Sequence, residues 1–125
     1  MDQQEVRQWI DRYVSAWQSG DRDEIGDLFT EDARYGYRPW ASEEHTVVGR
    51  DAIVESWLEN PDDPSAWTAS YKPYAVDGDR AVVVGWTRYQ GSADHPERKY
   101  HNAFLLRFRD GRCAEFNEFY VREKL

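Results

Sequence analysis

The sequence contains one cysteine, three histidines and no long hydrophobic run. The lone Cys113 excludes an internal disulfide and a cysteine-rich metal site, and it favours a cytoplasmic location. The histidines, His45, His95 and His101, lack the close spacings of a zinc site. We therefore expect no metal, although histidine and carboxylate side chains from distant segments could still converge.

No apolar run approaches the roughly 18 residues that cross a membrane, and the N-terminal segment MDQQEVRQWI lacks the pattern of a signal peptide. The 16 basic and 24 acidic residues give a net charge of −8, which argues against nucleic acid or an anionic membrane as a partner. Hydrophobic residues make up 40% of the chain, as in folded globular proteins. The length suits a single domain over residues 1–125 with one core.

Aromatic residues are abundant, with 6 Trp, 8 Tyr and 5 Phe, and apolar periodicity assigns several of them to helices. Spacings of three and four residues predict a first helix with one apolar face. This face is formed by Val6, Trp9, Ile10, Tyr13, Val14 and Trp17. Gly20 is suited to end this helix, and Asp21 to cap a short second one. A third helix is predicted after Gly49.

The remaining apolar segments have the pattern of strands. Alternation predicts a strand over residues 33–38. Turn signals divide the second half of the chain into four more strands, at 67–76, 80–90, 99–108 and 112–122. The order helix, helix, strand, helix and four-strand meander predicts an α+β fold, in which the helices pack on one face of a curved antiparallel sheet.

The segment FNEFY (116–120) places a carboxylate, Glu118, on the same strand face as two aromatic rings. A two-residue turn at Asp110-Gly111 would put the apolar faces of the last two strands on opposite sides of the sheet. A three-residue loop over 109–111 makes the faces agree and pairs Glu118 with Asn102. We therefore expect Glu118 to lie directly across from Asn102, with both side chains facing inward.

An inward carboxylate has two interpretations. It is either part of a structural network, paired with Asn102 or with an arginine such as Arg34 or Arg38, or a pocket carboxylate that transfers protons because burial raises its pKa. Inward tyrosines also carry hydroxyls that need partners, and several of them converging on one cavity favour a binding site. The tyrosines concerned are Tyr13, Tyr35 and Tyr37.

Three segments resemble the SnoaL-like branch of the nuclear transport factor 2-like superfamily: RYVSAWQSGDRDEIGDLFTEDARY (12–35), VVGRDAIVESW (47–57) and FRDGRCAEFNEFY (108–120). The resemblance covers nearly the whole chain. It implies a cone in which helices close one end of a strongly curved sheet around a hydrophobic pocket. Its members include polyketide cyclases, ketosteroid isomerase, limonene epoxide hydrolase, scytalone dehydratase and non-catalytic binding proteins. The resemblance implies no cofactor.

The resemblance assigns roles to single residues only in part. RYVSAWQSGD is similar to the segment of ketosteroid isomerase that bears its oxyanion-hole tyrosine, which implies that role for Tyr13. The two working aspartates of the isomerase fall on Tyr37 and Phe104, which argues against steroid isomerisation. The last strand is more similar to the cyclases and the epoxide hydrolase, whose pocket carboxylate corresponds to Glu118.

We therefore predict a cofactor-independent enzyme of the lyase, isomerase or cyclase type, acting by acid–base catalysis on a small, hydrophobic, cyclic molecule. Glu118 would move the proton and Asn102 would orient it, while Tyr13 and Tyr37 would hydrogen-bond a substrate oxygen. The alternative is a non-catalytic small-molecule-binding or dimerisation domain. The other side chains expected to line the pocket are Trp17, Tyr35, Trp40, Trp57, Tyr100, Phe104, Phe116 and Tyr120.

The predicted sheet is apolar on both faces. One face receives Val82, Val84 and Trp86, and neighbouring strands add Ala103, Leu105, Phe119 and Val121. No predicted helix remains to cover this outer face, which is costly to leave exposed to water. We therefore expect a homodimer packed through the outer sheet face near Trp86, as is common in the superfamily that the sequence resembles.

Overall fold

The computed structural model describes residues 1–40 and 43–124 as an α+β fold. Its elements, in chain order, are α1 (Gln3–Ser19), α2 (Arg22–Asp27), β1 (Phe29–Gly36), the 3₁₀ turn η1 (Glu43–His45), β2 (Thr46–Val48), α3 (Arg50–Glu59), β3 (Trp67–Asp77), β4 (Arg80–Tyr89), β5 (Arg98–Arg109) and β6 (Arg112–Arg122). The strands form one sheet in the order β2-β1-β6-β5-β4-β3. The predicted fold class and the four-strand meander are confirmed.

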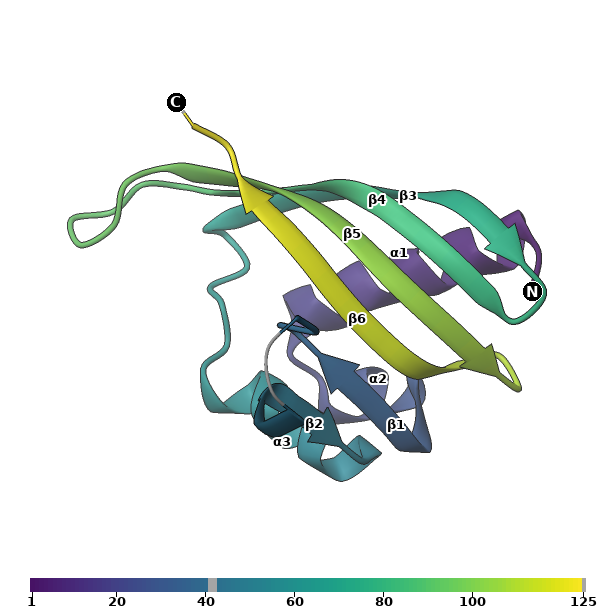
Figure 1. Cartoon of the computed structure of the whole chain (residues 1–125). Coiled ribbons are helices and arrows are strands. Elements are labelled where there is room, and N and C mark those ends of the chain that lie inside the picture. Colours follow the sequence, from purple (N-terminus) through teal and green to yellow (C-terminus); the bar gives the residue numbers. More distant parts are fainter. Residues whose placement is uncertain (41–42, 125) are drawn as a thin grey trace.

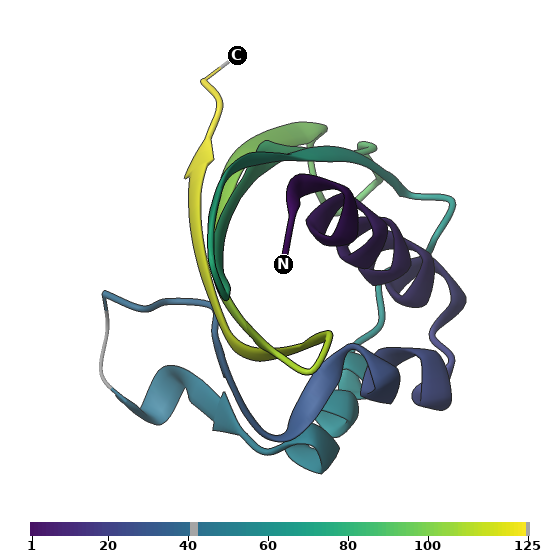
Figure 2. The same ribbon diagram turned by 90° about the vertical axis from the view of Figure 1, so that its right-hand side faces the viewer.

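The sheet curves strongly, and all helices lie on its concave side. Figure 2 shows α1 running inside the curve formed by β3 to β6, while α2 and α3 lie beside β1 (Figures 1 and 2). One strand pair departs from the prediction, because β1 runs parallel to β6 and makes the sheet mixed. Two parallel strands must be joined by a long crossover connection, and most of the chain lies between β1 and β6. Local sequence patterns therefore do not predict that these two strands pair.

Helix α1 begins and ends where its sequence allows. The Asp2 side chain accepts a hydrogen bond from the Glu5 backbone N–H, and the Glu5 carboxylate accepts one from Asp2, which together form a capping box. Gly20 closes the helix in the left-handed conformation, with φ 63°, as predicted. The buried stripe of α1 comprises Val6, Trp9, Ile10, Tyr13 and Ala16.

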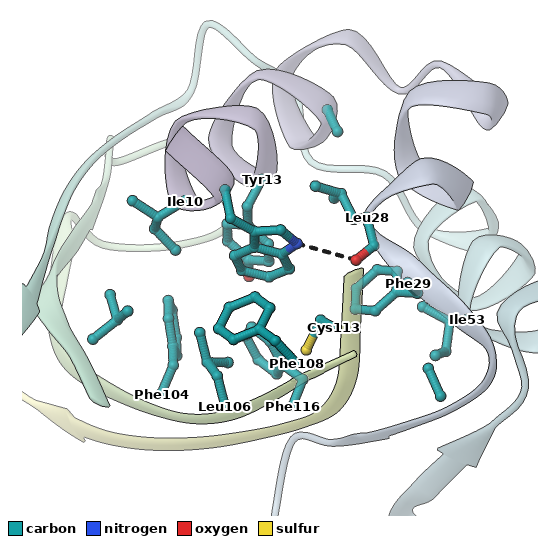
Figure 3. Close-up of a cluster of buried hydrophobic side chains, with 14 of the residues drawn as sticks. Ile10, Tyr13, Leu28, Phe29, Ile53, Phe104, Leu106, Phe108, Cys113 and Phe116 are labelled. Atoms are coloured by element: carbon teal, nitrogen blue, oxygen red, sulfur yellow. Dashed lines mark hydrogen bonds between the residues drawn. The ribbon is translucent and has the colours of Figure 1, made fainter. Parts of the chain in front are cut away.

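The core between α1 and the sheet is organised around Trp9, which is fully buried. The Trp9 indole packs edge-on against Phe108, at 5.5 Å between ring centroids. Its Nε1 donates a hydrogen bond to the Leu28 carbonyl oxygen at 3.0 Å (Figure 3). The same oxygen accepts a second hydrogen bond from the Cys113 backbone N–H at 2.8 Å. One carbonyl therefore ties α1 and the start of β1 to β6.

The β5–β6 hairpin does not have the predicted register. The turn has two residues, Asp110 and Gly111, both with positive φ (54° and 79°), and Arg109 pairs with Arg112. A β-bulge follows at Ala114, because Phe108 pairs with Cys113 whereas Arg107 pairs with Glu115. The extra residue in the bulge places the apolar faces of β5 and β6 on the same side of the sheet. The predicted three-residue loop is therefore not needed for this agreement.

The predicted pairing of Asn102 with Glu118 is therefore wrong by two residues. Glu118 lies opposite Phe104, and Asn102 lies opposite Tyr120. Both polar side chains still face the concave side, because a shift of two residues preserves the side of the sheet. They are diagonal neighbours on adjacent strands, which places them within reach of one another.

Gly85, in the middle of β4, allows the neighbouring strand to approach closely. A Cβ atom at this position would lie 2.0 Å from the Ser70 carbonyl oxygen and 2.6 Å from Cδ1 of Tyr71. Glycine is therefore the residue that lets β3 pair tightly here and lets the Tyr71 ring pass over the backbone of β4.

We expect Gly85→Ala to lower the free energy of unfolding by about 1–3 kcal/mol, because backbone or ring must move to admit the methyl group. Gly26→Ala is the matched control, since its Cβ would have only ordinary contacts at 3.8 Å. That control should leave stability unchanged or raise it. Urea unfolding of both variants measures the difference, and equal stability of the two would contradict a steric role for Gly85.

Candidate active site

A cavity of about 410 Å³ opens on the concave side of the sheet. It lies between α1, the end of α3 with the loop that follows it, β1 and the strands β3 to β6, and its volume suits a small ligand. Its lining side chains are Tyr13, Trp17, Tyr35, Ser56, Trp57, Asn60, Asp62, Tyr71, Thr87, Tyr89, Arg98, Tyr100, Asn102, Glu118 and Tyr120. Phenol, amide and hydroxyl groups predominate, so the cavity can form hydrogen bonds with a polar ligand.

Most of the residues expected in the pocket are brought together here. Those that line the cavity are Glu118, Tyr13, Asn102, Trp17, Tyr35, Trp57, Tyr100 and Tyr120. Helix α1 supplies its members at a spacing of four residues, and the strands supply theirs from one face of the sheet.

Four expected residues lie elsewhere. Strand β1 ends at Gly36, so Tyr37 leaves the strand alternation, is 41% exposed and packs edge-on against His45. Trp40 is 58% exposed, packs against the rings of Phe119 and Tyr120, and does not line the cavity. Both placements correct the expectation that these side chains line the pocket.

Phe104 and Phe116 are core residues that support the cavity from behind. They are 1% and 0% exposed and do not line it. The Phe116 ring stacks on Tyr35 at 4.5 Å and on Tyr13 at 5.5 Å between centroids. Phe104 contacts Tyr13 as well. These contacts restrict the tyrosine rings whose hydroxyls reach the cavity, so the two phenylalanines position binding groups rather than touch a ligand.

Glu118 is partly buried and has a neutral partner. The Asn102 side-chain Nδ2 donates a hydrogen bond to Glu118 Oε1 at 3.2 Å. Within the part of the chain that the structure describes, no lysine, arginine or histidine forms an ion pair with Glu118. Burial raises the pKa of Glu118 from 4.5 to about 7, and the hydrogen bond from Asn102 opposes this rise. A carboxyl group with such a pKa can accept and return a proton near neutrality.

A chain of hydrogen bonds extends from Asn102 across the sheet. The Thr87 hydroxyl donates to Asn102 Oδ1 at 3.0 Å, and the Tyr71 hydroxyl is hydrogen-bonded to Thr87 Oγ1. Tyr71, Thr87, Asn102 and Glu118 thus come from β3, β4, β5 and β6, one from each strand. The amide of Asn102 therefore has partners on both of its polar atoms.

Two tyrosines that line the cavity with Glu118, Tyr13 and Tyr35, stay protonated at neutral pH. Burial, with contributions from Tyr35 and the Glu118 carboxylate, raises the pKa of Tyr13 well above 10. Burial also raises the pKa of Tyr35, again with a contribution from Glu118. The Tyr13 hydroxyl is hydrogen-bonded to the Tyr35 hydroxyl, which lowers the pKa of Tyr35 in part. Both phenols are therefore neutral, and the pair can offer a hydrogen-bond donor to an oxygen atom of a ligand.

Charged groups occur at the edge of the cavity. Asp62 accepts a hydrogen bond from the Trp17 indole Nε1 at 3.1 Å. The Arg98 guanidinium lies 4.5 Å above the centre of the Tyr89 ring. The cavity lining therefore includes one further carboxylate, Asp62, and one cation, Arg98.

Several lining residues were not identified from the sequence, among them Tyr71, Thr87, Tyr89 and Arg98. A signal existed for Thr87, which has the same parity as the inward-facing Val83 and Gly85 on its strand. No such signal existed for Tyr71, because inward parity on β3 could be assigned only once its register with β4 was known.

Over residues 1–40 and 43–124, no group of three or more His, Cys, Asp or Glu side chains is placed to hold a metal ion. In the same residues, no helix is both long and apolar enough to span a membrane.

Solved structures with this fold share little sequence with the chain. SalBIII, an epoxide hydrolase/cyclase-like enzyme associated with pyran ring formation in the polyether salinomycin, is 19% identical at a TM-score of 0.74, over 96% of this chain and 93% of its own. An LEH-like epoxide hydrolase of M. tuberculosis is 12% identical at 0.69, over 95% and 84%. An NTF2-like protein of Burkholderia xenovorans LB400 is 22% identical at 0.67, over 97% and 92%.

At these identities the likeness to the solved structures is one of fold. No curated protein matches the chain significantly. A family profile described as the SnoaL-like domain matches residues 10–116, which contain the C-terminal part of α1, all of α2 and α3, and most of the sheet. The chain therefore belongs to the SnoaL-like domain family.

Proposed function

We propose that the protein is a cofactor-independent acid–base enzyme, with Glu118 as the group that accepts and returns a proton. The observation that carries this proposal is a carboxyl group inside a ligand-sized cavity, with a neutral amide as its hydrogen-bond partner and a pKa near 7. A glutamate that only stabilised the fold would be expected to face a cation, since an ionised carboxylate in a partly buried site otherwise costs free energy.

The neighbouring residues suit distinct roles in such a reaction. Asn102 holds the Glu118 carboxylate, and the Tyr13 and Tyr35 hydroxyls face the same cavity. Proton removal by Glu118 would leave an electron pair on the substrate, which moves to a conjugated oxygen. Tyr35, with Tyr13 hydrogen-bonded behind it, would stabilise that oxyanion by donating a hydrogen bond. Tyr35 takes the part first assigned to Tyr37, which lies outside the cavity.

If the proton returned to another atom of the substrate, the enzyme would be an isomerase. If the electron pair expelled a leaving group, it would be a lyase, and if the electron pair attacked an electrophile in the same molecule, it would be a cyclase. The fold is compatible with all three classes. Its likeness to SalBIII, described as epoxide hydrolase/cyclase-like, supports ring-forming chemistry as a member of this set. The substrate expected is a small molecule with an apolar ring and oxygen substituents, since aromatic side chains and hydroxyls line the cavity together.

Replacing Glu118 should change how stability depends on pH. Because its pKa in the folded protein is raised from 4.5 to about 7, the carboxyl group contributes stability below pH 4.5 that is lost as the pH rises through 7. Glu118→Gln cannot ionise. Its free energy of unfolding relative to wild type should therefore rise by about 2 kcal/mol from pH 5 to pH 8. Urea melts at the two pH values measure this without a substrate.

The opposite result would identify a structural glutamate. A Glu118→Gln variant that is less stable than wild type by roughly 3–5 kcal/mol at pH 8 would mean that the ionised carboxylate stabilises the fold. With any substrate that the wild type converts, the same variant should lower kcat at least about 100-fold, as expected for the loss of a general base. Full activity of a folded Glu118→Gln protein would refute the proposal.

Steroid isomerisation is not expected. Phe104 and Tyr37 occupy the positions that the resemblance to ketosteroid isomerase assigns to its two aspartates, and Tyr37 faces solvent. We expect no conversion of a Δ5-3-ketosteroid above the uncatalysed rate, followed by the absorbance of the conjugated enone. Rapid conversion would show that a different group serves as the base.

We also propose a homodimer packed through the convex face of the sheet. The helices cover only the concave side (Figure 2). On the convex side Leu105, Phe119 and Val121 are exposed, and Trp86 is covered in part by Lys99, whose Nζ lies 5.1 Å from the ring. A second copy would remove this apolar surface from water.

Light scattering at micromolar concentration should give the mass of a dimer for the wild type. Leu105→Glu would bury a charge in the interface and should give a monomer. Ala52→Glu, on the exposed side of α3, is the matched control and should remain a dimer. A monomeric wild type would contradict this assembly.

A further inference from the structure

The hydrogen-bond chain behind Glu118 has a defined direction. Asn102 uses its Nδ2 amide to donate to Glu118, so its Oδ1 faces Thr87. The single hydroxyl proton of Thr87 is therefore committed to Asn102. Thr87 Oγ1 can then only accept from the Tyr71 hydroxyl. Every bond in the chain thus donates towards Glu118.

An asparagine side chain can present either of its two polar atoms to a neighbour. Turned by half a rotation, Asn102 would offer Glu118 a carbonyl oxygen, which requires a proton on the carboxyl group. In the observed orientation it offers an N–H, which favours the ionised carboxylate. The two orientations therefore favour opposite protonation states of Glu118.

We propose that Thr87, held in turn by Tyr71, is a positioning residue that keeps the Asn102 amide turned with its N–H towards Glu118. Thr87 is buried, at 3% exposure, and its hydroxyl bonds to Asn102 and Tyr71. It acts on Glu118 through Asn102. The catalytic importance of this positioning rests on the function proposed above. The orientation of the amide itself can be tested without turnover.

Gly85 makes this arrangement sterically feasible. Gly85 pairs with Tyr71 on β3 and with Asn102 on β5. No side chain on β4 therefore stands between the Tyr71 and Asn102 side chains at this position. An added Cβ would meet Cδ1 of Tyr71 at 2.6 Å. The Tyr71 ring can therefore lie across β4 and reach Thr87, two residues further along the strand.

The test is an NMR titration of the Glu118 carboxyl carbon in protein labelled with ¹³C-glutamate. The Glu118 signal is identified as the one that is absent from the spectrum of the Glu118→Gln variant. Thr87→Val keeps the side-chain shape but removes the hydroxyl, so the amide loses its constraint. We expect the pKa of Glu118 to rise by about one unit, the size expected when a carboxylate loses a donor. Thr87→Ser restores the hydroxyl and should titrate as wild type does.

A double-mutant cycle shows whether Thr87 acts through Asn102. Asn102→Ala should itself raise the pKa of Glu118, and adding Thr87→Val should then cause no further shift. A Thr87→Val titration equal to wild type would overturn the proposal. So would an undiminished shift in the Asn102→Ala background. If Thr87→Val does not fold, Tyr71→Phe should give a smaller shift of the same sign, and no shift in that variant would also overturn the proposal.

Failure of the proposed function would have a different signature. A wild-type Glu118 that titrates near 4.5 would contradict its role as the base, whatever Thr87 does. A wild-type titration near 7 with equal Thr87→Val and Thr87→Ser curves would leave the base in place and reject the positioning role. The two ideas are therefore separated by one set of titrations.

Discussion

The β-bulge at Ala114 decides which way the end of β6 faces. The two-residue turn at Asp110-Gly111 alone would direct the apolar side of β6 away from that of β5. One extra residue reverses this, so that Phe116 enters the core and Glu118 enters the cavity. Both the packing of α1 on the sheet and the candidate base depend on this local irregularity, which costs the sheet one ladder position.

Burying a carboxyl group without a cation is unfavourable, and the surroundings of Glu118 reduce this cost without removing it. Asn102 supplies one hydrogen bond to Glu118, and its own Oδ1 accepts one from Thr87, which is in turn hydrogen-bonded to Tyr71. A neutral partner stabilises the ionised form less than an arginine would, so burial still dominates and the pKa stays near 7. With these neutral partners, Glu118 can change its protonation state near neutral pH. A salt bridge would instead hold the carboxylate ionised.

The core and the cavity share their aromatic residues. Phe116 is fully buried, yet it stacks on both Tyr13 and Tyr35, which line the cavity. Trp9 stacks on Tyr13 from the helix side, at 5.6 Å between centroids. Core packing therefore restrains the rings that would bind a ligand. Substitutions in the core are expected to alter the positions of these rings in the cavity.

The sequence by itself determined the α+β class, the end of α1 at Gly20, the four-strand meander and an inward-facing Glu118 near Asn102, because periodicity and turn residues act over a few positions. Only the tertiary structure decided the parallel pairing of β1 with β6 and the bulge in β6. It also placed Tyr37 outside the cavity and Tyr71 inside it. These features depend on which strands meet and in which register, and such contacts between distant segments leave no periodic trace in a single sequence.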